Sequence, residues 1–130
     1  MYLDANFFIF VSSLTDKQGV QAREILKTIM AGKRAVSSVL AIDEVMWVIY
    51  KNRQQDKLRT IIENIYSIQN LTVKEVSPAI PLKALHFIEK CGLKPRDAFH
   101  AAIMEELGET EIVSDDIDFD NIPGITRIKL

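Results

Sequence analysis

The chain begins with Met1-Tyr2-Leu3-Asp4-Ala5-Asn6, in which a short apolar run stops at an acidic residue. A second apolar run, at 111–114, is followed within four residues by Asp115, Asp116 and Asp118. We predict that both runs are buried strands of one parallel sheet, because short apolar runs bounded by turn formers are typical of such strands. Ligands bind at the carboxyl ends of parallel strands, so if the two strands are neighbours these acids share one edge of the sheet.

Between these two strands, short apolar runs alternate with longer stretches of helical periodicity. This alternation predicts crossover units, and therefore an α/β fold with a mainly parallel sheet of four or five strands and helices on both faces. The length fits one three-layer α/β/α domain that spans residues 1–130. We expect strands at 1–3, 35–37, 71–76, 111–114 and 125–128, and helices at 17–31, 39–50, 56–68, 77–90 and 95–107, with a helix or turn at 6–14.

The composition excludes several classes of protein. Hydrophobic residues make up 48% of the chain and charged residues 26%, which is the balance of a packed domain and excludes a disordered or collagen-like chain. The apolar run at 7–11 is far shorter than the ~20 residues that span a bilayer, and Asp4 stands where an export signal carries positive charge. The single cysteine excludes an internal disulfide, and the net charge of −2 excludes a globally basic nucleic-acid binder. We therefore expect a cytoplasmic protein without membrane contact.

Two acidic residues, Asp43 and Glu44, interrupt the apolar sequence of the helix predicted at 39–50. The residues around them are apolar on every side, which predicts a buried helix. An unpaired buried carboxylate costs several kcal/mol, so at least one of the two must meet a cation, a hydrogen-bond donor or a cleft. A salt bridge to an arginine is the structural alternative to a functional role, and the helical phase does not choose between the two acids.

Two further acids stand where helices begin, and each has a structural alternative. Asp4 suits a turn or a helix cap after its strand. Asp97 is the third residue of the helix that Pro95 opens, where a carboxylate stabilises the helix dipole by up to about 1 kcal/mol. His100 follows one turn later, and we predict that it is a packing residue of this alanine-rich face.

The acidic loop at 114–120 holds four aspartates in six positions. A solvated acidic turn is one interpretation, and an oxygen-rich site for a divalent cation is the other. The loop lacks the ligand spacing of an EF-hand. The basic residues at 51–59 are expected to form a solvated helix face, with contact to phosphates as the alternative.

Taken together, these motifs resemble the PIN-domain ribonucleases, in particular the toxins of VapBC toxin–antitoxin pairs, and the resemblance covers essentially the whole chain. Residues 3–6 are similar to the first motif of that family, Ser38 with Glu44 to the second, 96–102 to the third and 112–119 to the fourth. The resemblance favours Glu44 over Asp43. The acids that it matches are Asp4, Glu44, Asp97 and Asp116, with Asp118 as an auxiliary acid and Asn6 and Ser114 as supporting polar residues.

The resemblance implies a divalent-metal-dependent endoribonuclease that hydrolyses RNA phosphodiester bonds. It implies Mg²⁺ or Mn²⁺ as cofactor, with Asp4, Asp97 and Asp116 as metal contacts and Glu44 and Asp118 orienting them. It further implies an RNA substrate, an antitoxin protein as partner, and a homodimer.

Three alternatives stay open. The extra acids Asp115 and Asp120 leave open whether Asp115 or Asp116 is the main acid of the fourth motif. A catalytically idle PIN-like module that binds RNA or protein is a second alternative, although idle metal sites have no physical reason to keep costly buried carboxylates. A haloacid-dehalogenase-type phosphatase is a third, but that class carries an acid two residues after its first aspartate, where this chain has Asn6.

Overall fold

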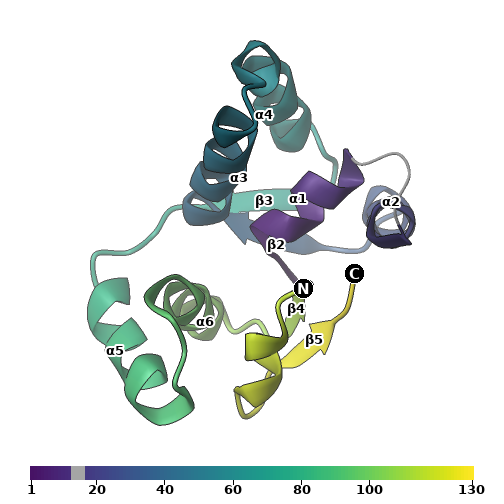
Figure 1. The fold of residues 1–130 in the computed structure, drawn as a ribbon. Helices are drawn as coiled ribbons and strands as arrows, with labels where there is room; N and C mark the ends of the chain where they lie inside the picture. The colour runs from purple at the N-terminus through teal and green to yellow at the C-terminus, as the bar shows by residue number, and fades with distance from the viewer. Residues whose placement is uncertain (13–16) are drawn as a thin grey trace.

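Five parallel strands form one sheet in the part of the chain that the structure, a computed structural model, describes, namely residues 1–12 and 17–130 (Figure 1). The strand order is β3-β2-β1-β4-β5, and every neighbouring pair is parallel, which confirms the predicted sheet. In the central strand, Tyr2 pairs with Val36 on one side and with Ile112 on the other. The strands are β1 (Tyr2–Leu3), β2 (Ala35–Ser38), β3 (Leu71–Lys74), β4 (Glu111–Val113) and β5 (Thr126–Ile128).

The helices follow the predicted order with small shifts at their ends. They are α1 (Ala5–Val11), α2 (Lys17–Met30), α3 (Val39–Lys51), α4 (Leu58–Tyr66), α5 (Ile80–Cys91) and α6 (Pro95–Leu107), with short 3-10 helices η1 (Gln55–Lys57) and η2 (Ile117–Asn121). The helix predicted from residue 77 begins at Ile80, because Ser77 first forms a turn in which its hydroxyl accepts a hydrogen bond from Ala79 N. The last two residues of the segment predicted at 6–14 lie outside the described residues. Within the described ranges, no helix is both long and apolar enough to cross a membrane.

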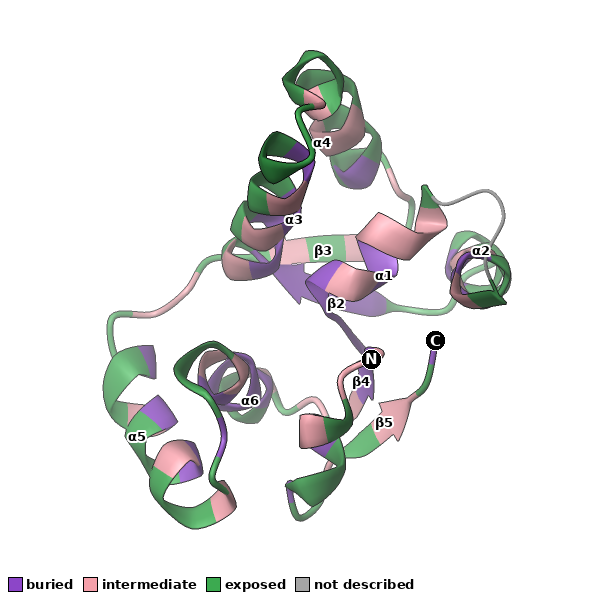
Figure 2. Cartoon of the chain, viewed as in Figure 1, coloured by how far each residue is buried: buried purple, intermediate pink, exposed green. Residues whose placement is uncertain are grey.

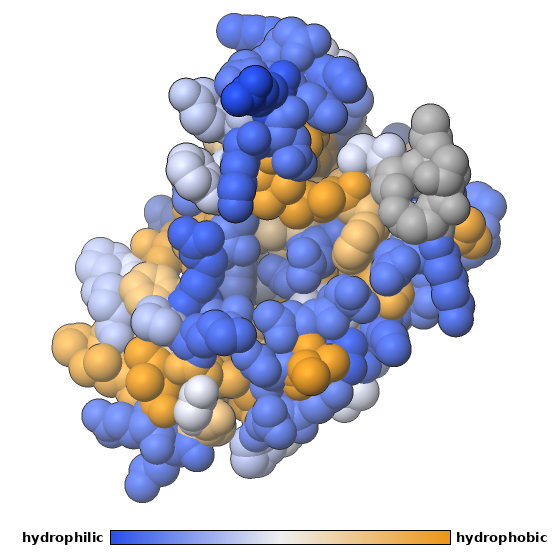
Figure 3. Space-filling view, in the orientation of Figure 1, coloured by the Kyte–Doolittle hydropathy of each residue, from blue (hydrophilic) through white to orange (hydrophobic). Residues whose placement is uncertain are grey.

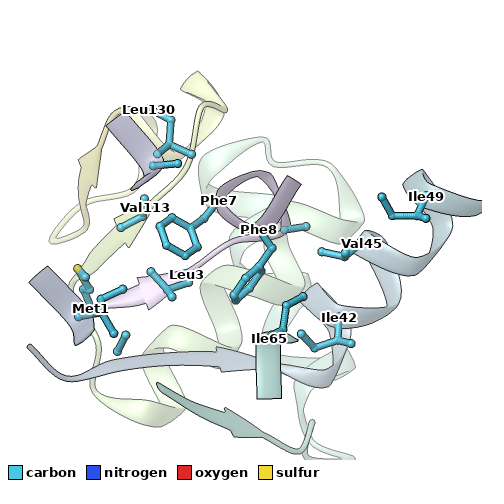
Figure 4. Close-up of a cluster of buried hydrophobic side chains, with 14 residues drawn as sticks. Met1, Leu3, Phe7, Phe8, Ile42, Val45, Ile49, Ile65, Val113 and Leu130 are labelled. Atoms are coloured by element: carbon cyan, nitrogen blue, oxygen red, sulfur yellow. The ribbon is translucent and has the colours of Figure 1, made fainter. Parts of the chain in front are cut away.

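Helices cover both faces of the sheet, because side chains along a strand point alternately to its two faces. Leu3 and Val113 point into a core that they share with α1, α2, α3 and α4, in which Phe7 is fully buried (Figure 4). Tyr2 and Ile112 point into a second core with α5 and α6. The chain therefore has the three-layer α/β/α arrangement expected from its sequence (Figure 1).

The prediction that the third helix is buried on every side is wrong. Ile42, Val45 and Ile49 of α3, spaced three or four residues apart, face the core. Trp47 and Tyr50 are more than half exposed and stack on each other with ring centroids 6.3 Å apart. Figure 2 shows that much of α3 is exposed. Apolar residues are common on protein surfaces, so an apolar sequence does not by itself show that both sides of a helix are covered.

The strand order reverses between β1 and β4. From β1 the sheet extends through β2 to β3 on one side, and through β4 to β5 on the other. In open α/β sheets, the point where the strand order reverses in this way is the place where ligands bind. Asp4 directly follows β1, and Ser114 to Asp116 directly follow β4. The two acidic segments therefore share one edge, as predicted.

Candidate active site

Asp4 lies at the centre of this edge, and 5% of its surface is exposed. It is the N-cap of α1, because its Oδ1 accepts a hydrogen bond of 2.6 Å from Ala5 N. Its Oδ2 accepts from the hydroxyl of Ser114 at 2.7 Å and from the side-chain amide of Asn6 at 3.3 Å. The capping role expected as an alternative is therefore real, and it also fixes the direction in which this carboxylate points.

Glu44 reaches the same edge from the second turn of α3, whereas Asp43 is exposed to solvent. Ser38 caps the start of this helix with its hydroxyl, which accepts a hydrogen bond from Ala41 N. The Oε1 atom of Glu44 lies 3.1 Å from Nε2 of His100 and 3.3 Å from Nε of Arg96. Glu44 is thus the acid of the pair that faces the other acids, and the salt bridge expected as an alternative is also present.

His100 is buried among these acids, where the sequence predicted only a packing role. Its Nε2 atom lies 3.1 Å from Glu44 and 3.7 Å from Oδ1 of Asp4, so the three residues bring one ligand atom each within 4.8 Å of one another. On the other side of the ring, Nδ1 lies 2.8 Å from the hydroxyl of Tyr2. His100 is therefore part of the polar site as well as of the packed face of α6.

A second acidic group adjoins the first. Carboxylate oxygens of Asp97, Asp116 and Asp118 lie within 4.8 Å of one another. Asp116 caps η2 by accepting a hydrogen bond from Asp118 N, and Asp118 forms an ion pair of 2.9 Å with Lys94. Among the described residues, none donates a hydrogen bond to the Asp97 carboxylate. Its place in the first turn of α6 suits the helix dipole.

The other two aspartates of the loop stand apart from this group. Asp120 is exposed and forms a two-pronged ion pair with Arg127, with N···O distances of 2.8 and 2.7 Å. Arg127 also donates to the carbonyl of Ser114, so the pair braces the loop after β4. Asp115 belongs to neither acidic group, which places Asp116 and not Asp115 opposite Asp97.

The predicted metal contacts are thus divided between two adjoining groups. Asp4 belongs to the group with Glu44 and His100, and Asp97 and Asp116 belong to the other. Asp97 and His100 connect the groups, since they lie one turn apart on α6 and each shifts the pKa of the other.

The electrostatics of the site follow from this crowding. Burial raises the pKa of Asp4, with a further rise from the charge of Glu44. Burial also raises the pKa of Asp97, and repulsion from Asp116 adds to the effect. Burial by itself lowers the pKa of His100, but the carboxylates of Glu44 and Asp4 outweigh it, so that the pKa of His100 is raised. Carboxylates held in this way favour a bound cation or proton.

Besides the site role of His100, sequence reasoning missed three further residues of this site. Lys94 and Arg96 precede Asp97 and form ion pairs with Asp118 and Glu44, respectively. Arg96 is the first residue of the third motif and Lys94 lies just before it, which was the available signal. Tyr2 gave no signal, because its contact with His100 spans 98 positions of the chain. The basic stretch at 51–59 is different, since its Arg59 pairs with Glu63 on the exposed surface of α4.

Known proteins resemble this chain over nearly its whole length. A family model for the PIN domain matches residues 1–125. Ribonuclease VapC13 of Mycobacterium tuberculosis and a VapC ribonuclease of Mycobacterium bovis are each 23% identical to the chain over 134 residues, covering 97% of both sequences.

Solved structures are similar over almost the whole chain. Mycobacterium tuberculosis VapC20, described as a toxin that cleaves the sarcin-ricin loop, has a TM-score of 0.78 at 16% identity and covers 99% of this chain and 98% of its own. VapBC2 of Rickettsia felis, bound to a DNA fragment from its promoter, has a TM-score of 0.77 at 15% identity and covers 98% and 96%. A toxin–antitoxin complex from Klebsiella pneumoniae has a TM-score of 0.70 at 21% identity and covers 96% and 94%.

Proposed function

The chain belongs to the PIN domain family, and from this premise we propose that it is a divalent-metal-dependent endoribonuclease and the toxin of a toxin–antitoxin pair. One observation carries the proposal. Carboxylates from four separate segments form two adjoining groups at the carboxyl edge of the sheet, one from after β1 and from α3, the other from α6 and from after β4. The ribonuclease names of the two mycobacterial relatives support the same activity.

The donor set fits Mg²⁺ or Mn²⁺. Both are hard cations that prefer carboxylate oxygens and retain water or substrate phosphate as further ligands. Asp4, Asp97 and Asp116 would hold the cation. Asp97 is the best placed of the three to accept one, since its carboxylate has no hydrogen-bond donor among the described residues.

The surrounding residues orient these ligands. Ser114 and Asn6 donate to one oxygen of Asp4 and leave its direction little freedom. Glu44 and Asp118 add negative charge beside the ligands and are themselves held by His100 and Lys94. Hydrogen bonds of this kind around metal ligands typically affect metal affinity or activity by about 10- to 100-fold.

When bound, the cation lowers the pKa of a coordinated water and neutralises charge on the reacting phosphate. The protein contributes cations of its own at the rim. More than half of the Arg96 side chain is exposed although its Nε atom lies beside Glu44, and Lys94 is more exposed still. We propose that both bind RNA phosphates beside the acids, which would let a chain of net charge −2 attract RNA locally.

We propose an antitoxin protein as partner and a groove between α1, α2 and α4 as the place where it binds. The groove has a volume of about 370 Å³ and is lined mainly by apolar residues, among them Phe8, Leu26, Met30 and Ile61. Grooves of this kind accept the apolar face of an amphipathic helix. The Klebsiella structure, titled a toxin–antitoxin complex, supports a partner of this class.

The proposal includes a homodimer. Apolar side chains gather over α5 in Figure 3, where Leu82 is 74% and Leu85 50% exposed. Apolar patches on a surface are typical of interfaces between proteins. A second copy of this chain is the proposed partner for this face.

Cleavage of a labelled RNA in the presence of Mn²⁺ tests the function. Asp4→Asn and Asp116→Asn should each lower the rate of cleavage at least ~100-fold, because a metal ligand loses its charge while its shape is kept. Asp115→Asn and Asp43→Asn are matched controls, because both acids lie beside site residues but outside the acidic groups. Full activity of Asp4→Asn, or of the wild type in excess EDTA, would refute the proposal.

A further inference from the structure

A chain of buried hydrogen bonds runs from the sheet to the acidic site. The hydroxyl of Ser38 lies 2.7 Å from that of Tyr2, which lies 2.8 Å from Nδ1 of His100. The opposite ring nitrogen, Nε2, lies 3.1 Å from Oε1 of Glu44. At most 1% of the surface of Ser38, Tyr2 or His100 is exposed, so these hydrogen bonds are shielded from water as far as Glu44.

The chemistry of the groups fixes how the imidazole is used. Glu44, as a carboxylate, only accepts hydrogen bonds, so Nε2 of His100 carries the hydrogen between them. The other nitrogen, Nδ1, is occupied by the hydroxyl of Tyr2, which accepts or donates as the ring requires. Both ends of the ring are therefore held, and an edge-to-face contact with Tyr2, with centroids 5.7 Å apart, fixes its plane.

This arrangement joins the three elements that carry three of the acids. Tyr2 is on β1, two residues before Asp4, and Ser38 is the cap of α3, which carries Glu44. His100 is on α6, one turn after Asp97. Glu44 has three rotatable side-chain bonds, and apart from His100 its one ion-pair partner within the described residues is the largely exposed Arg96.

We propose that His100, with Tyr2 behind it, is a positioning residue that holds Glu44 in its place beside the metal ligands. The inference rests on the proposed function. His100 acts through Glu44 and is not itself a metal ligand, since its Nε2 atom uses its hydrogen toward Glu44, 3.1 Å away, and lies 3.7 Å from Oδ1 of Asp4.

Substitutions at His100 separate this role from packing. His100→Leu fills the space but cannot donate, whereas the side-chain amide of His100→Gln can donate from a position near that of Nε2. We expect His100→Leu to weaken Mn²⁺ binding about 10-fold in calorimetry without RNA, and to lower kcat by 10- to 100-fold with KM within twofold. His100→Gln should recover most of both losses. Tyr2→Phe, which removes one hydroxyl, should lower the Mn²⁺ affinity and kcat by a smaller factor of about 3 to 10.

Matched controls are the same changes at exposed positions, His86→Leu on α5 and Tyr50→Phe on α3, which should leave both quantities unchanged. Equal Mn²⁺ affinity and kcat in wild type and His100→Leu would overturn the inference, and so would a His100→Gln variant as impaired as His100→Leu. Nitrogen NMR of the His100 ring gives a second readout, and it needs only the wild-type protein. We expect Nε2 to keep its hydrogen when Mg²⁺ is added, and its loss would make His100 a ligand and overturn the inference.

The two proposals fail in distinguishable ways. If wild type binds Mn²⁺ but does not cleave RNA, the proposed function fails, while the Mn²⁺ affinities of the variants still decide the role of His100. If wild type cleaves RNA and the His100 and Tyr2 variants match it, only the positioning role fails. A wild type that binds no Mn²⁺ contradicts both.

Discussion

Replacing Asp97 with asparagine should stabilise the metal-free protein or leave its stability unchanged, although it removes a charge from the favourable end of a helix. Oxygens of Asp97, Asp116 and Asp118 lie within 4.8 Å of one another. At that distance and the dielectric constant of water, each pair of charges repels by ~0.9 kcal/mol. Removing two such repulsions gains about 2 kcal/mol, whereas the lost helix-dipole interaction costs up to about 1 kcal/mol. The lost attraction to Lys94 is weakened by solvent, because that side chain is exposed. We therefore expect a gain between zero and about 2 kcal/mol at pH 7.

The pH dependence of this difference has a definite sign. Burial and the charge of Asp116 raise the pKa of Asp97 in the folded protein above its unfolded value. The folded state then binds more protons than the unfolded state between those two pKa values, so wild type gains stability as the pH falls through the raised pKa. The advantage of Asp97→Asn should be largest at neutral pH and should disappear once the pH is below the unfolded carboxyl value of about 4.

Urea unfolding with EDTA and with Mn²⁺ measures both effects. At a hundred times its dissociation constant, Mn²⁺ should add about 2.7 kcal/mol to the free energy of unfolding of wild type. If Asp97→Asn binds Mn²⁺ tenfold more weakly, its gain at the same concentration falls to about 1.4 kcal/mol. Asp115→Asn is the control and should keep the full gain. If Asp97→Asn is destabilised by more than 1 kcal/mol without metal and gains as much from Mn²⁺ as wild type, Asp97 is only a helix-capping residue.

Two further variants test the surroundings of the site. Asp120→Asn should leave RNA cleavage within twofold of wild type. Because the hydrogen bond from Arg127 lowers the pKa of Asp120, wild type should be more stable than the variant at neutral pH. Thermal unfolding should show that wild type loses this advantage as the pH falls through the lowered pKa. Met30→Glu in the groove between α1, α2 and α4 should abolish co-purification with the proposed antitoxin, with RNA cleavage unchanged. Cleavage lost together with antitoxin binding would argue against a separate docking groove, and so would binding that survives the added charge.

Much of the site could be predicted because it depends on local sequence. Asp4 and Asp116 follow short apolar strands, and a parallel sheet brings the ends of neighbouring strands together whatever the loops contain. Ser38 and Pro95 mark the starts of the two helices that carry the other acids. These signals act over a few residues, which is the range over which a sequence can be interpreted without knowing the fold.

The remainder depends on contacts between distant segments. The role of His100 requires Tyr2 and Glu44, which are 98 and 56 positions away, so in the sequence it resembles any histidine on an alanine-rich helix. The exposure of Trp47 could not be predicted either, because α3 is apolar on both sides and only the packing of its neighbours decides which side is covered. Long-range contacts therefore decide which side of α3 is covered, and they add His100 to the site.

Anomalous X-ray diffraction from a crystal soaked in Mn²⁺ tests the central claim most directly, because it locates the cation and names its ligands. We predict a peak at the carboxyl edge of the sheet, with oxygens of Asp97 and Asp116 about 2.1–2.3 Å away and Asp4 bound directly or through water. His100 should lie outside the coordination shell, with its Nε2 still directed at Glu44. A cation bound elsewhere on the protein, or no peak between these aspartates at millimolar Mn²⁺, would contradict the account.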